Sequence, residues 1–206
     1  MQLTTRWWWI RHAPVPDGGR IYGQRDLDCD CSDAAVFAAL ARAMPMDAVW
    51  ITSNLVRTKQ TAAAILAAMQ VPNEMRAVPA FAEQHFGDWQ GVERAKFLAA
   101  RANQHPHWFA PAIERAPNGE SFHDLFERVT GAIDELSREY AGRDIVAVTH
   151  GGTIRAAIGH AMGLDSEGSL ASGMIDNCSL TRIDRLEDAG WQVVAVNQRP
   201  WVSGNI

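Results

Sequence analysis

Cysteine is scarce in this chain, which has only Cys29, Cys31 and Cys178 among its 206 residues. An odd number rules out a fully paired disulfide framework, and the Cys29-x-Cys31 spacing is shorter than that of the usual zinc or redox pairs. We therefore expect three free thiols and a cytoplasmic protein, because the cytosol keeps cysteines reduced.

Long apolar runs and an excess of basic residues are also missing. No segment reaches the roughly 20 apolar residues that a membrane-spanning helix needs, and the N-terminal residues lack the pattern of a signal peptide. The formal net charge is −5, and the 19 Lys and Arg residues are scattered along the chain. We therefore expect no membrane partner and no nucleic-acid partner, since proteins that bind nucleic acid usually carry a basic face.

What the chain does contain is an alternation of short apolar runs with longer amphipathic stretches, which is typical of α/β proteins. The predicted strands cover residues 7–10, 48–51, 144–148, 180–183 and 191–196. Helices are expected after each of the first three strands, and another begins at Ser121, a good capping residue. At this length we expect a single domain over residues 1–206. The predicted architecture is a three-layer sandwich with a mostly parallel central sheet flanked by helices.

The segment 78–117 is the least regular part of the chain. We expect a loop with short helical pieces that forms a substrate-facing insertion, or lid, over one edge of the molecule. The aromatic residues around Trp108 leave two uses open, a cover for a pocket or the surface of a homodimer.

Nitrogen-bearing side chains follow three of the predicted strands. Arg11 and His12 end the first, Arg57 lies in the helix after the second, and His150 follows the third. Because the carboxyl ends of parallel strands share one edge of a sheet, these side chains are expected to converge there. Guanidinium groups match phosphate oxygens and keep their charge, and a helix N-terminus after His150 also favours an anion. Each residue alone has an ordinary structural explanation, but their conjunction predicts a phosphate site.

Five short motifs occur along the chain in a fixed order. They are Arg11-His12, residues 52–62, residues 83–91, residues 118–121 and residues 148–155. In content and order they resemble the motifs of the histidine phosphatase superfamily, the phosphoglycerate mutase-like proteins. The resemblance extends over nearly the whole chain and implies the phosphoglycerate mutase-like fold. Each motif alone is weak, whereas five in order are a strong indication.

The resemblance implies a phosphohistidine mechanism that needs no cofactor and no metal ion. His12 would attack phosphorus as a neutral imidazole, kept neutral by the nearby arginines, and water would then hydrolyse the phosphoenzyme. Arg11, Arg57 and His150 would hold the phosphoryl oxygens and offset their charge in the transition state. Glu83 would protonate the leaving alkoxide and then take a proton from the attacking water.

Glu83 is chosen among several nearby carboxylates. Glu74 and Glu93 are the alternatives, and the spacing of Glu83 to Phe86-Gly87 and to Trp89 decides for it.

Two positions depart from the family pattern. Ala13 stands where a glycine usually follows the nucleophilic histidine, and a methyl group would be costly if this position needed a positive φ or a close approach to phosphate. The asparagine expected a few residues further on is missing from residues 15–19. Gly23, Gln24 and Asp26 are the candidates for the contact that this asparagine would make.

The alternatives to a phosphatase differ in what they require. We call residues 83–91, which contain Glu83, the acid loop. The mutases of the superfamily carry a long basic insertion after this loop, but here residues 91–121 form a short span with four dispersed cations. This favours hydrolysis of a small-molecule phosphate ester. The Phe-Gly-Asp-Trp sequence in the acid loop resembles the α-ribazole phosphatase branch. Phosphoglycerate mutase-type transfer and a catalytically weak, phosphate-binding regulatory module stay open as alternatives.

A metal-dependent hydrolase is a further alternative. It would use His105, His107 and His123, but their spacing fits no recognised zinc pattern. We therefore expect no metal site.

Overall fold

The computed structural model describes residues 3–72, 74–101 and 110–202. These residues form one six-stranded sheet with the strand order β3-β2-β4-β1-β5-β6. The strands are β1 (Thr4–Arg11), β2 (Val49–Thr52), β3 (Arg76–Ala77), β4 (Asp144–Thr149), β5 (Leu180–Leu186) and β6 (Gly190–Gln198). The first four strands run parallel, and β5 and β6 form the antiparallel hairpin that the sequence predicts.

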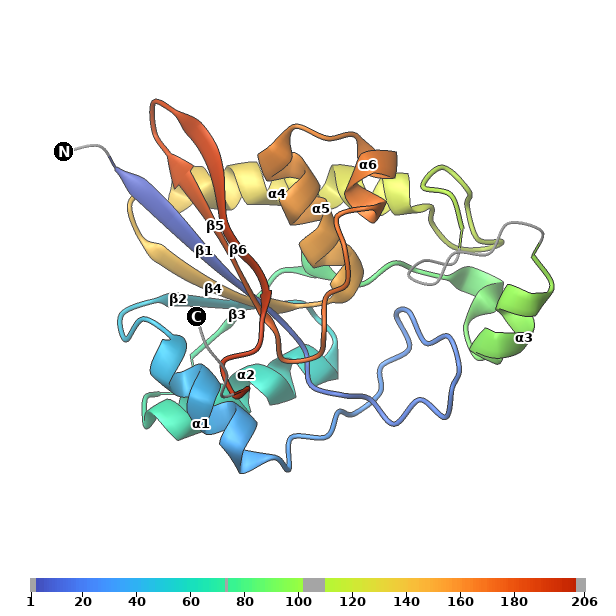
Figure 1. Cartoon of the computed structure of the whole chain (residues 1–206), viewed down its shortest axis with the longest axis horizontal. Helices are drawn as coiled ribbons and strands as arrows, with labels where there is room; N and C mark the ends of the chain where they lie inside the picture. The colour runs from blue at the N-terminus through green and yellow to red at the C-terminus, as the bar shows by residue number, and fades with distance from the viewer. Residues whose placement is uncertain (1–2, 73, 102–109, 203–206) are drawn as a thin grey trace.

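Helices cover both faces of this sheet, as predicted for a three-layer sandwich (Figure 1). The helices of the described ranges are α1 (Ala34–Ala43), α2 (Val56–Met69), α3 (Arg94–Ala99), α4 (Phe122–Glu139), α5 (Gly151–Met162) and α6 (Ser166–Leu170), of which α3 lies away from the sheet. The helices α1 and α2 lie on one face, whereas α4, α5 and α6 lie on the other. The irregular segment after β3 contains α3 and two short 3-10 helices, η1 (Pro79–Phe81) and η2 (Gly87–Trp89).

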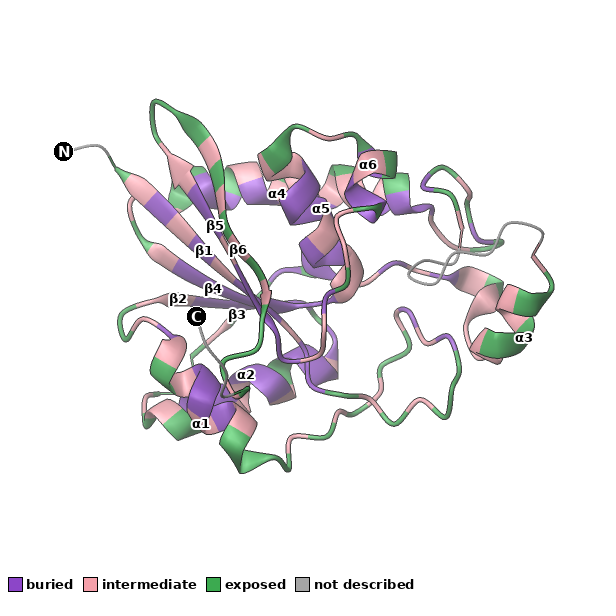
Figure 2. Ribbon diagram, viewed as in Figure 1, coloured by how far each residue is buried: buried purple, intermediate pink, exposed green. Residues whose placement is uncertain are grey.

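The central strand β4 is buried on both sides because it lies between β1 and β2 with helices above and below. Ile145 and Ala147 face the helices α4 and α5, whereas Val146 and Val148 face α1 and α2. Successive side chains of a strand point to opposite faces, so a strand covered twice must be apolar throughout. Figure 2 shows this pattern as buried colour along the middle strands and on the helix sides that face them.

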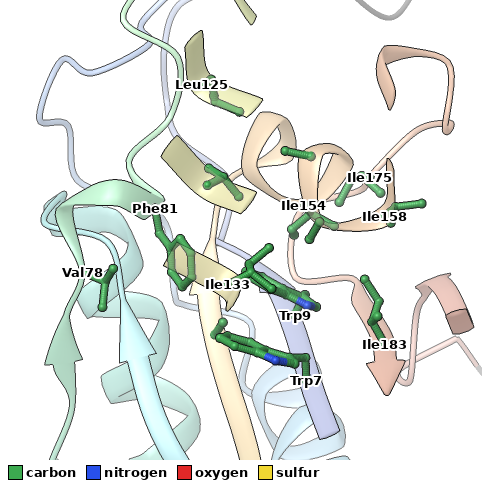
Figure 3. Packing of buried hydrophobic residues seen from close by; sticks show 14 of the residues in the cluster. Trp7, Trp9, Val78, Phe81, Leu125, Ile133, Ile154, Ile158, Ile175 and Ile183 are labelled. Atoms are coloured by element: carbon green, nitrogen blue, oxygen red, sulfur yellow. The ribbon is translucent and has the colours of Figure 1, made fainter. Parts of the chain in front are cut away.

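The tryptophan run in β1 contributes to packing, as the sequence suggests. Alternation places Trp7 and Trp9 on the same face, where their rings stack with centroids 4.8 Å apart. The ring of Phe81 meets both edge-on, at 6.1 and 5.3 Å (Figure 3). Trp7 also donates its indole hydrogen to Ser137 Oγ on α4 at 2.9 Å. This stack joins β1 to η1 and α4, and thereby holds the segment that leads to Glu83.

Replacing Trp9 by alanine is expected to destabilise the fold by about 3–5 kcal/mol, because a buried aromatic side chain would leave a cavity in the largest core cluster. Trp8 is the matched control, since it lies on the opposite face and is only partly buried. The free energy of unfolding from urea titrations measures both effects. Equal losses in the two variants would show that the stack is not the main packing element.

The N-termini of α2 and α5 each adjoin another part of the chain. Asp26 Oδ1 accepts a hydrogen bond from Val56 N, in the first turn of α2, at 2.7 Å. The helix α5 begins at Gly151, so that His150, directly after β4, is its N-cap residue. The strand β3 and the helix α6 were not predicted, because each is too short to show a periodic pattern.

Other expectations are met within the described ranges. Ser121 caps α4 with a capping box, and Gly163 ends α5 in the left-handed conformation. The three cysteines are free thiols. None of the helices in the described ranges has the length and apolar character that a bilayer crossing would require.

Candidate active site

The carboxyl ends of β1, β4 and β2 bring the predicted nitrogen-bearing side chains together. Arg11 pairs with Thr149 in the parallel ladder, and His12 N donates to Thr149 O at 2.9 Å. His12 and His150 therefore leave the sheet side by side, with ring centroids 5.2 Å apart. Arg57 enters from the first turn of α2, which follows the neighbouring strand β2.

His12 is held as a neutral imidazole with one defined tautomer. Its side chain is 1% exposed, and Nδ1 lies 2.8 Å from the carbonyl oxygen of Ala13. A carbonyl can only accept, so Nδ1 carries the proton and Nε2 carries the lone pair. Burial, and then the charges of Arg11 and Arg57, hold the pKa of His12 well below its usual value. Nε2 is therefore available as a nucleophile.

Three buried nitrogen atoms near His12 have no hydrogen-bond partner among the described residues: Arg11 Nε, Arg57 Nε and His150 Nδ1. The rest of each side chain is fixed. Arg11 donates to Ile175 O at 2.6 Å, and Arg57 donates to the carbonyl oxygens of residues 23 and 25 at 2.6 and 2.9 Å. An unpaired buried donor costs about 1–3 kcal/mol. Three such atoms beside a neutral imidazole form an arrangement that a bound anion would satisfy.

Ser53 sets the orientation of the second histidine. Its Oγ lies 2.8 Å from His150 Nε2. When Ser53 donates to Nε2, the proton of His150 lies on Nδ1, which is then a third donor without a partner among the described residues. The pKa of His150 is held well below its usual value, first by burial and then by Arg57 and His12. The site thus combines neutral imidazoles with permanently charged guanidinium groups.

Glu83 lies against the N-terminus of α5. Its Oε2 accepts a hydrogen bond from Gly152 N at 3.3 Å, and its Oε1 accepts one from Gln84 N at 2.9 Å. A Cβ on Gly152 would lie 2.3 Å from Glu83 Oε1, so only glycine permits this approach. Glu93, by contrast, pairs with Lys96 at 2.9 Å beside α3, and Glu74 is exposed. Geometry therefore favours Glu83 among the three carboxylates.

Arg128 braces the acid loop, and sequence reasoning did not find it. It donates to the carbonyl oxygens of residues 80, 82 and 83 at 2.7 to 3.1 Å and pairs with Glu120 at 2.6 Å. Glu120 in turn accepts a hydrogen bond from His85 N at 2.8 Å. No local motif marks Arg128, because the three carbonyl groups that it binds lie 45 to 48 residues earlier in the chain. Glu120, which lies in the motif at residues 118–121, therefore helps to hold the acid loop in place.

The substitution at Ala13 is accommodated. Among the described non-glycine residues, positive φ values occur only at Gln70, Asn118, Cys178 and Asn197. Ala13 is fully buried in the core cluster on the α1 and α2 side, and its amide donates to Thr61 Oγ1 at 2.9 Å. The position therefore needs neither glycine's conformational freedom nor a bare backbone.

The three candidates for the missing asparagine contact have other partners. Gly23 O accepts from Arg57, Gln24 Nε2 donates to Glu83 O at 2.9 Å, and Asp26 holds the N-terminus of α2. These contacts hold Arg57, Glu83 and the start of α2 in place. Two other residues contact it instead. Tyr22 places its ring 5.0 Å from the guanidinium carbon of Arg57, and Asn177 donates to His12 O at 2.8 Å.

A cavity of about 380 Å³ lies in front of this cluster. Arg11, Glu83 and residues 151–152 form part of its wall. His12, Arg57 and His150 are not among its lining residues, and 1%, 0% and 0% of their surfaces are exposed. The volume suits a small molecule.

The metal alternative has no support in the described ranges. Of its three histidines, His105 and His107 lie outside the described residues, as does Trp108. His123 has its Nδ1 3.2 Å from Ser166 Oγ. Within the described ranges no group of three or more potential ligands could hold a metal ion.

Acid is expected to destabilise the protein below about pH 6.5, the usual pKa of histidine. In the folded state the pKa values of His12 and His150 lie well below this value, so the unfolded chain binds up to two more protons. The free energy of unfolding should fall by up to about 2.7 kcal/mol per pH unit from this cause. Urea titrations between pH 7.5 and 5.5 measure the slope, and the His12→Asn variant should lose about half of it. An unchanged slope in that variant would contradict the assignment.

The comparison with known proteins agrees with this geometry. A family model described as "Histidine phosphatase superfamily (branch 1)" matches residues 7–199. A metal-independent phosphoserine phosphatase of Arabidopsis thaliana is 27% identical, over 88% of this chain and 76% of that protein. The structure of a mycobacterial glucosyl-3-phosphoglycerate phosphatase superposes with a TM-score of 0.80 at 26% identity, covering 94% of this chain and 99% of its own.

A third neighbour bears on the fold alone. The α-ribazole phosphatase of Shigella flexneri has a TM-score of 0.76 at 23% identity, over 94% of this chain and 96% of its own.

Proposed function

Since the chain belongs to the histidine phosphatase superfamily, we propose that His12 carries the phosphoryl group during hydrolysis of a small-molecule phosphomonoester. The chain is a phosphatase of a family in which phosphohistidine intermediates are typical, and its relatives include named phosphatases. The single observation that carries the residue assignment is the Nε2 lone pair of His12 beside three buried nitrogens that have no hydrogen-bond partner among the described residues.

In the first step, His12 Nε2 attacks phosphorus and the bond from phosphorus to the alcohol oxygen breaks. The hydrogen bond from Nδ1 to Ala13 O keeps the ring oriented and stabilises the positive charge that develops on it. Arg11, Arg57 and His150 hold the phosphoryl oxygens as the group transfers. Glu83, in its protonated form, donates its proton to the departing alkoxide.

In the second step, Glu83 is a carboxylate and accepts a proton from the attacking water. The oxygen of that water bonds to phosphorus, the bond to His12 Nε2 breaks, and inorganic phosphate leaves. The contacts of Glu83 with Gly152 N and Gln84 N fix the carboxyl group between α5 and the cavity. One group therefore serves both steps, because the alcohol leaves and the water enters on the same side of phosphorus.

Hydrolysis is favoured over mutase-type transfer by the state of the cations after the acid loop. All four cations between residues 91 and 121 are ion-paired: Arg94 with Asp17, Lys96 with Glu93, Arg101 with Glu114 and Arg115 with Asp124. A doubly phosphorylated sugar acid would need positive charge that is not already neutralised. This supports a monoester as the substrate.

The remaining assignments extend the proposal. Residues 78–117 form the substrate-facing part of a single domain over residues 1–206, and Glu83, Gln84, Phe86 and Arg94 from this segment line the cavity. The three free thiols support a cytoplasmic location. α-Ribazole phosphate stays a candidate substrate, and a homodimer stays a prediction that the oligomeric state in solution will test.

The proposal is tested with p-nitrophenyl phosphate, with and without EDTA, followed by acid-free quenching to trap a labelled phosphoenzyme. We expect release of p-nitrophenol that EDTA does not reduce, and a label that is stable to base and labile to acid. Loss of activity in EDTA with recovery on adding a metal ion would overturn the mechanism. Binding of phosphate without any release at any pH would favour the regulatory module. A panel of phosphomonoesters that includes α-ribazole phosphate then ranks the substrates by kcat/KM.

A further inference from the structure

The charged side chains that line the cavity do not cancel one another. They are Arg11, Asp17, Glu83, Arg94 and Arg155. Asp17 and Arg94 form an ion pair at 2.8 Å, and Arg94 also donates to Arg20 O. Arg11 and Glu83 are assigned to the phosphoryl group and to proton transfer. Arg155 is therefore left as a cation in the cavity wall to which the proposed chemistry gives no role.

The position of Arg155 follows from the helix that opens the site. It lies on α5 one turn after Gly151, so it shares the face of that helix on which Gly151 approaches Arg11. Its Nε donates to Gly173 O at 3.0 Å, which fixes the plane of the guanidinium group. The two remaining nitrogens, Nη1 and Nη2, have no hydrogen-bond or ion-pair partner within the described ranges.

Arg155 also lies in an environment that disfavours an uncompensated charge. Burial is the first cause of a lowered pKa of Arg155; the charge of Glu83 opposes it, and the charge of Arg11 adds to it more weakly. A mostly buried cation that has no ion pair in the described ranges is costly unless a ligand supplies further charge and hydrogen bonds. Two parallel N–H groups on a planar guanidinium suit a carboxylate, which accepts both in a bidentate pair.

We propose that Arg155 binds a carboxylate on the alcohol part of the substrate and thereby makes the enzyme selective for phosphomonoesters of hydroxy acids. This inference rests on the proposed function and adds the chemical class of the leaving group. A carboxylate is favoured over a second phosphate, because only Arg155 is left for it among the three arginines that line the cavity in the described ranges: Arg11 is assigned to the phosphoryl group and Arg94 is paired with Asp17. Arg155 is a specificity residue in this account, since it contacts the leaving group and not the reacting atoms.

A purely structural role for Arg155 makes a different prediction. If its only task were to hold Gly173 and to place a positive charge near Glu83, its loss would affect all substrates alike. If it binds a carboxylate, its loss should affect only substrates that carry one. The ratio of kcat/KM within a matched pair of esters separates the two roles.

Two matched pairs serve as probes. Phosphoglycolate and ethylene glycol monophosphate differ by a carboxylate in place of a hydroxymethyl group, and O-phosphoserine and O-phosphoethanolamine differ by a carboxylate in place of hydrogen. The wild-type enzyme is expected to prefer the carboxylate in at least one pair by about tenfold or more in kcat/KM, the size of one charged hydrogen-bonded contact. Arg155→Gln should reduce this preference to about twofold or less and leave the neutral ester within about threefold of the wild type. Arg155→Lys should retain part of the preference.

Arg94→Gln is the matched control, because it removes a cation of the same cavity that is already paired with Asp17. Its preference for the carboxylate is expected to stay within about threefold of the wild-type value. Thermal unfolding and turnover of p-nitrophenyl phosphate verify that each variant is folded.

The outcomes separate this inference from the proposed function. Equal rates on both members of both pairs, or an equal loss for both members in Arg155→Gln, would overturn the carboxylate site while phosphatase activity stands. The carboxylate site would also be overturned if the enzyme hydrolysed none of the four esters but still turned over p-nitrophenyl phosphate. Absence of any turnover, together with absence of a phosphoenzyme, would remove the proposed function itself.

Discussion

Replacing His12 by alanine is expected to lower kcat/KM for p-nitrophenyl phosphate on the order of 10⁴-fold or more, the range seen when a covalent nucleophile is removed. No other described side chain offers an imidazole lone pair beside the three unpartnered nitrogens, because His150 Nε2 is engaged with Ser53. The label that marks the phosphoenzyme should vanish in the same variant. Phosphate binding should survive in part, since Arg11, Arg57 and His150 are untouched.

The control for His12→Ala is His160→Ala. His160 lies on α5 but faces Asp134, with its Nε2 3.1 Å from Oδ1, and it packs against Trp191. Its replacement should leave kcat/KM within a few-fold of the wild type. Rapid-quench labelling and steady-state kinetics on both variants measure the difference. A His12→Ala variant that still forms a base-stable phosphoenzyme would move the nucleophile to another histidine.

Replacing Glu83 by glutamine is expected to lower kcat/KM for an alkyl phosphate by about 10²–10⁴-fold, because a poor leaving group needs the proton that Glu83 supplies. Glutamine keeps the size of the side chain and one acceptor oxygen, so it can retain one of the two hydrogen bonds from Gly152 N and Gln84 N. p-Nitrophenolate leaves without a proton, so the first step should remain fast with that substrate. Hydrolysis of the phosphoenzyme still needs a base, and therefore the variant should show a burst of p-nitrophenol followed by slow turnover.

Glu93→Gln provides the comparison for this prediction. Glu93 was an alternative candidate for the acid because it lies close to Glu83 in the sequence. In the structure it pairs with Lys96 and is not among the residues that line the cavity. It should show neither the loss on alkyl phosphates nor the burst. Stopped-flow measurements of p-nitrophenol release resolve the two phases. A burst in Glu93→Gln, or an equal loss on both ester types in Glu83→Gln, would reassign the acid.

The fold was predictable to the extent that it depends on local pattern. The parallel core strands, the terminal hairpin and the capping of α4 by Ser121 follow from apolar runs and from residues adjacent in sequence. The helix α2 shows where this fails. Its N-terminus is capped by Asp26, which lies 30 residues away, and no local signal reports such a partner. The segment α3 and its surroundings were placed as irregular, since they contain no sustained periodicity.

The concern over Ala13 shows a second limit of sequence reasoning. A motif comparison treats the missing glycine as a risk, because glycine often serves a positive φ. The structure gives Ala13 an ordinary backbone, a buried methyl group and a hydrogen bond to Thr61. Whether a position tolerates a methyl group depends on the space around it, and that space is formed by α2, about 50 residues later in the chain.

The sequence by itself determined the kind of chemistry, because Arg11, His12, Arg57 and His150 each adjoin an apolar strand whose end must lie at one edge of a parallel sheet. Only the tertiary structure decided the orientation, the tautomer and the hydrogen-bond partners of those groups. Four features depend on burial, distances and contacts that the linear sequence does not display: the tautomer of His12, the contact of Glu83 with α5, the contacts of Arg128, and the lack of an ion pair for Arg155 among the described residues. Burial and hydrogen-bond partners are properties of the packed chain, because they are determined by contacts between segments that are distant in the sequence.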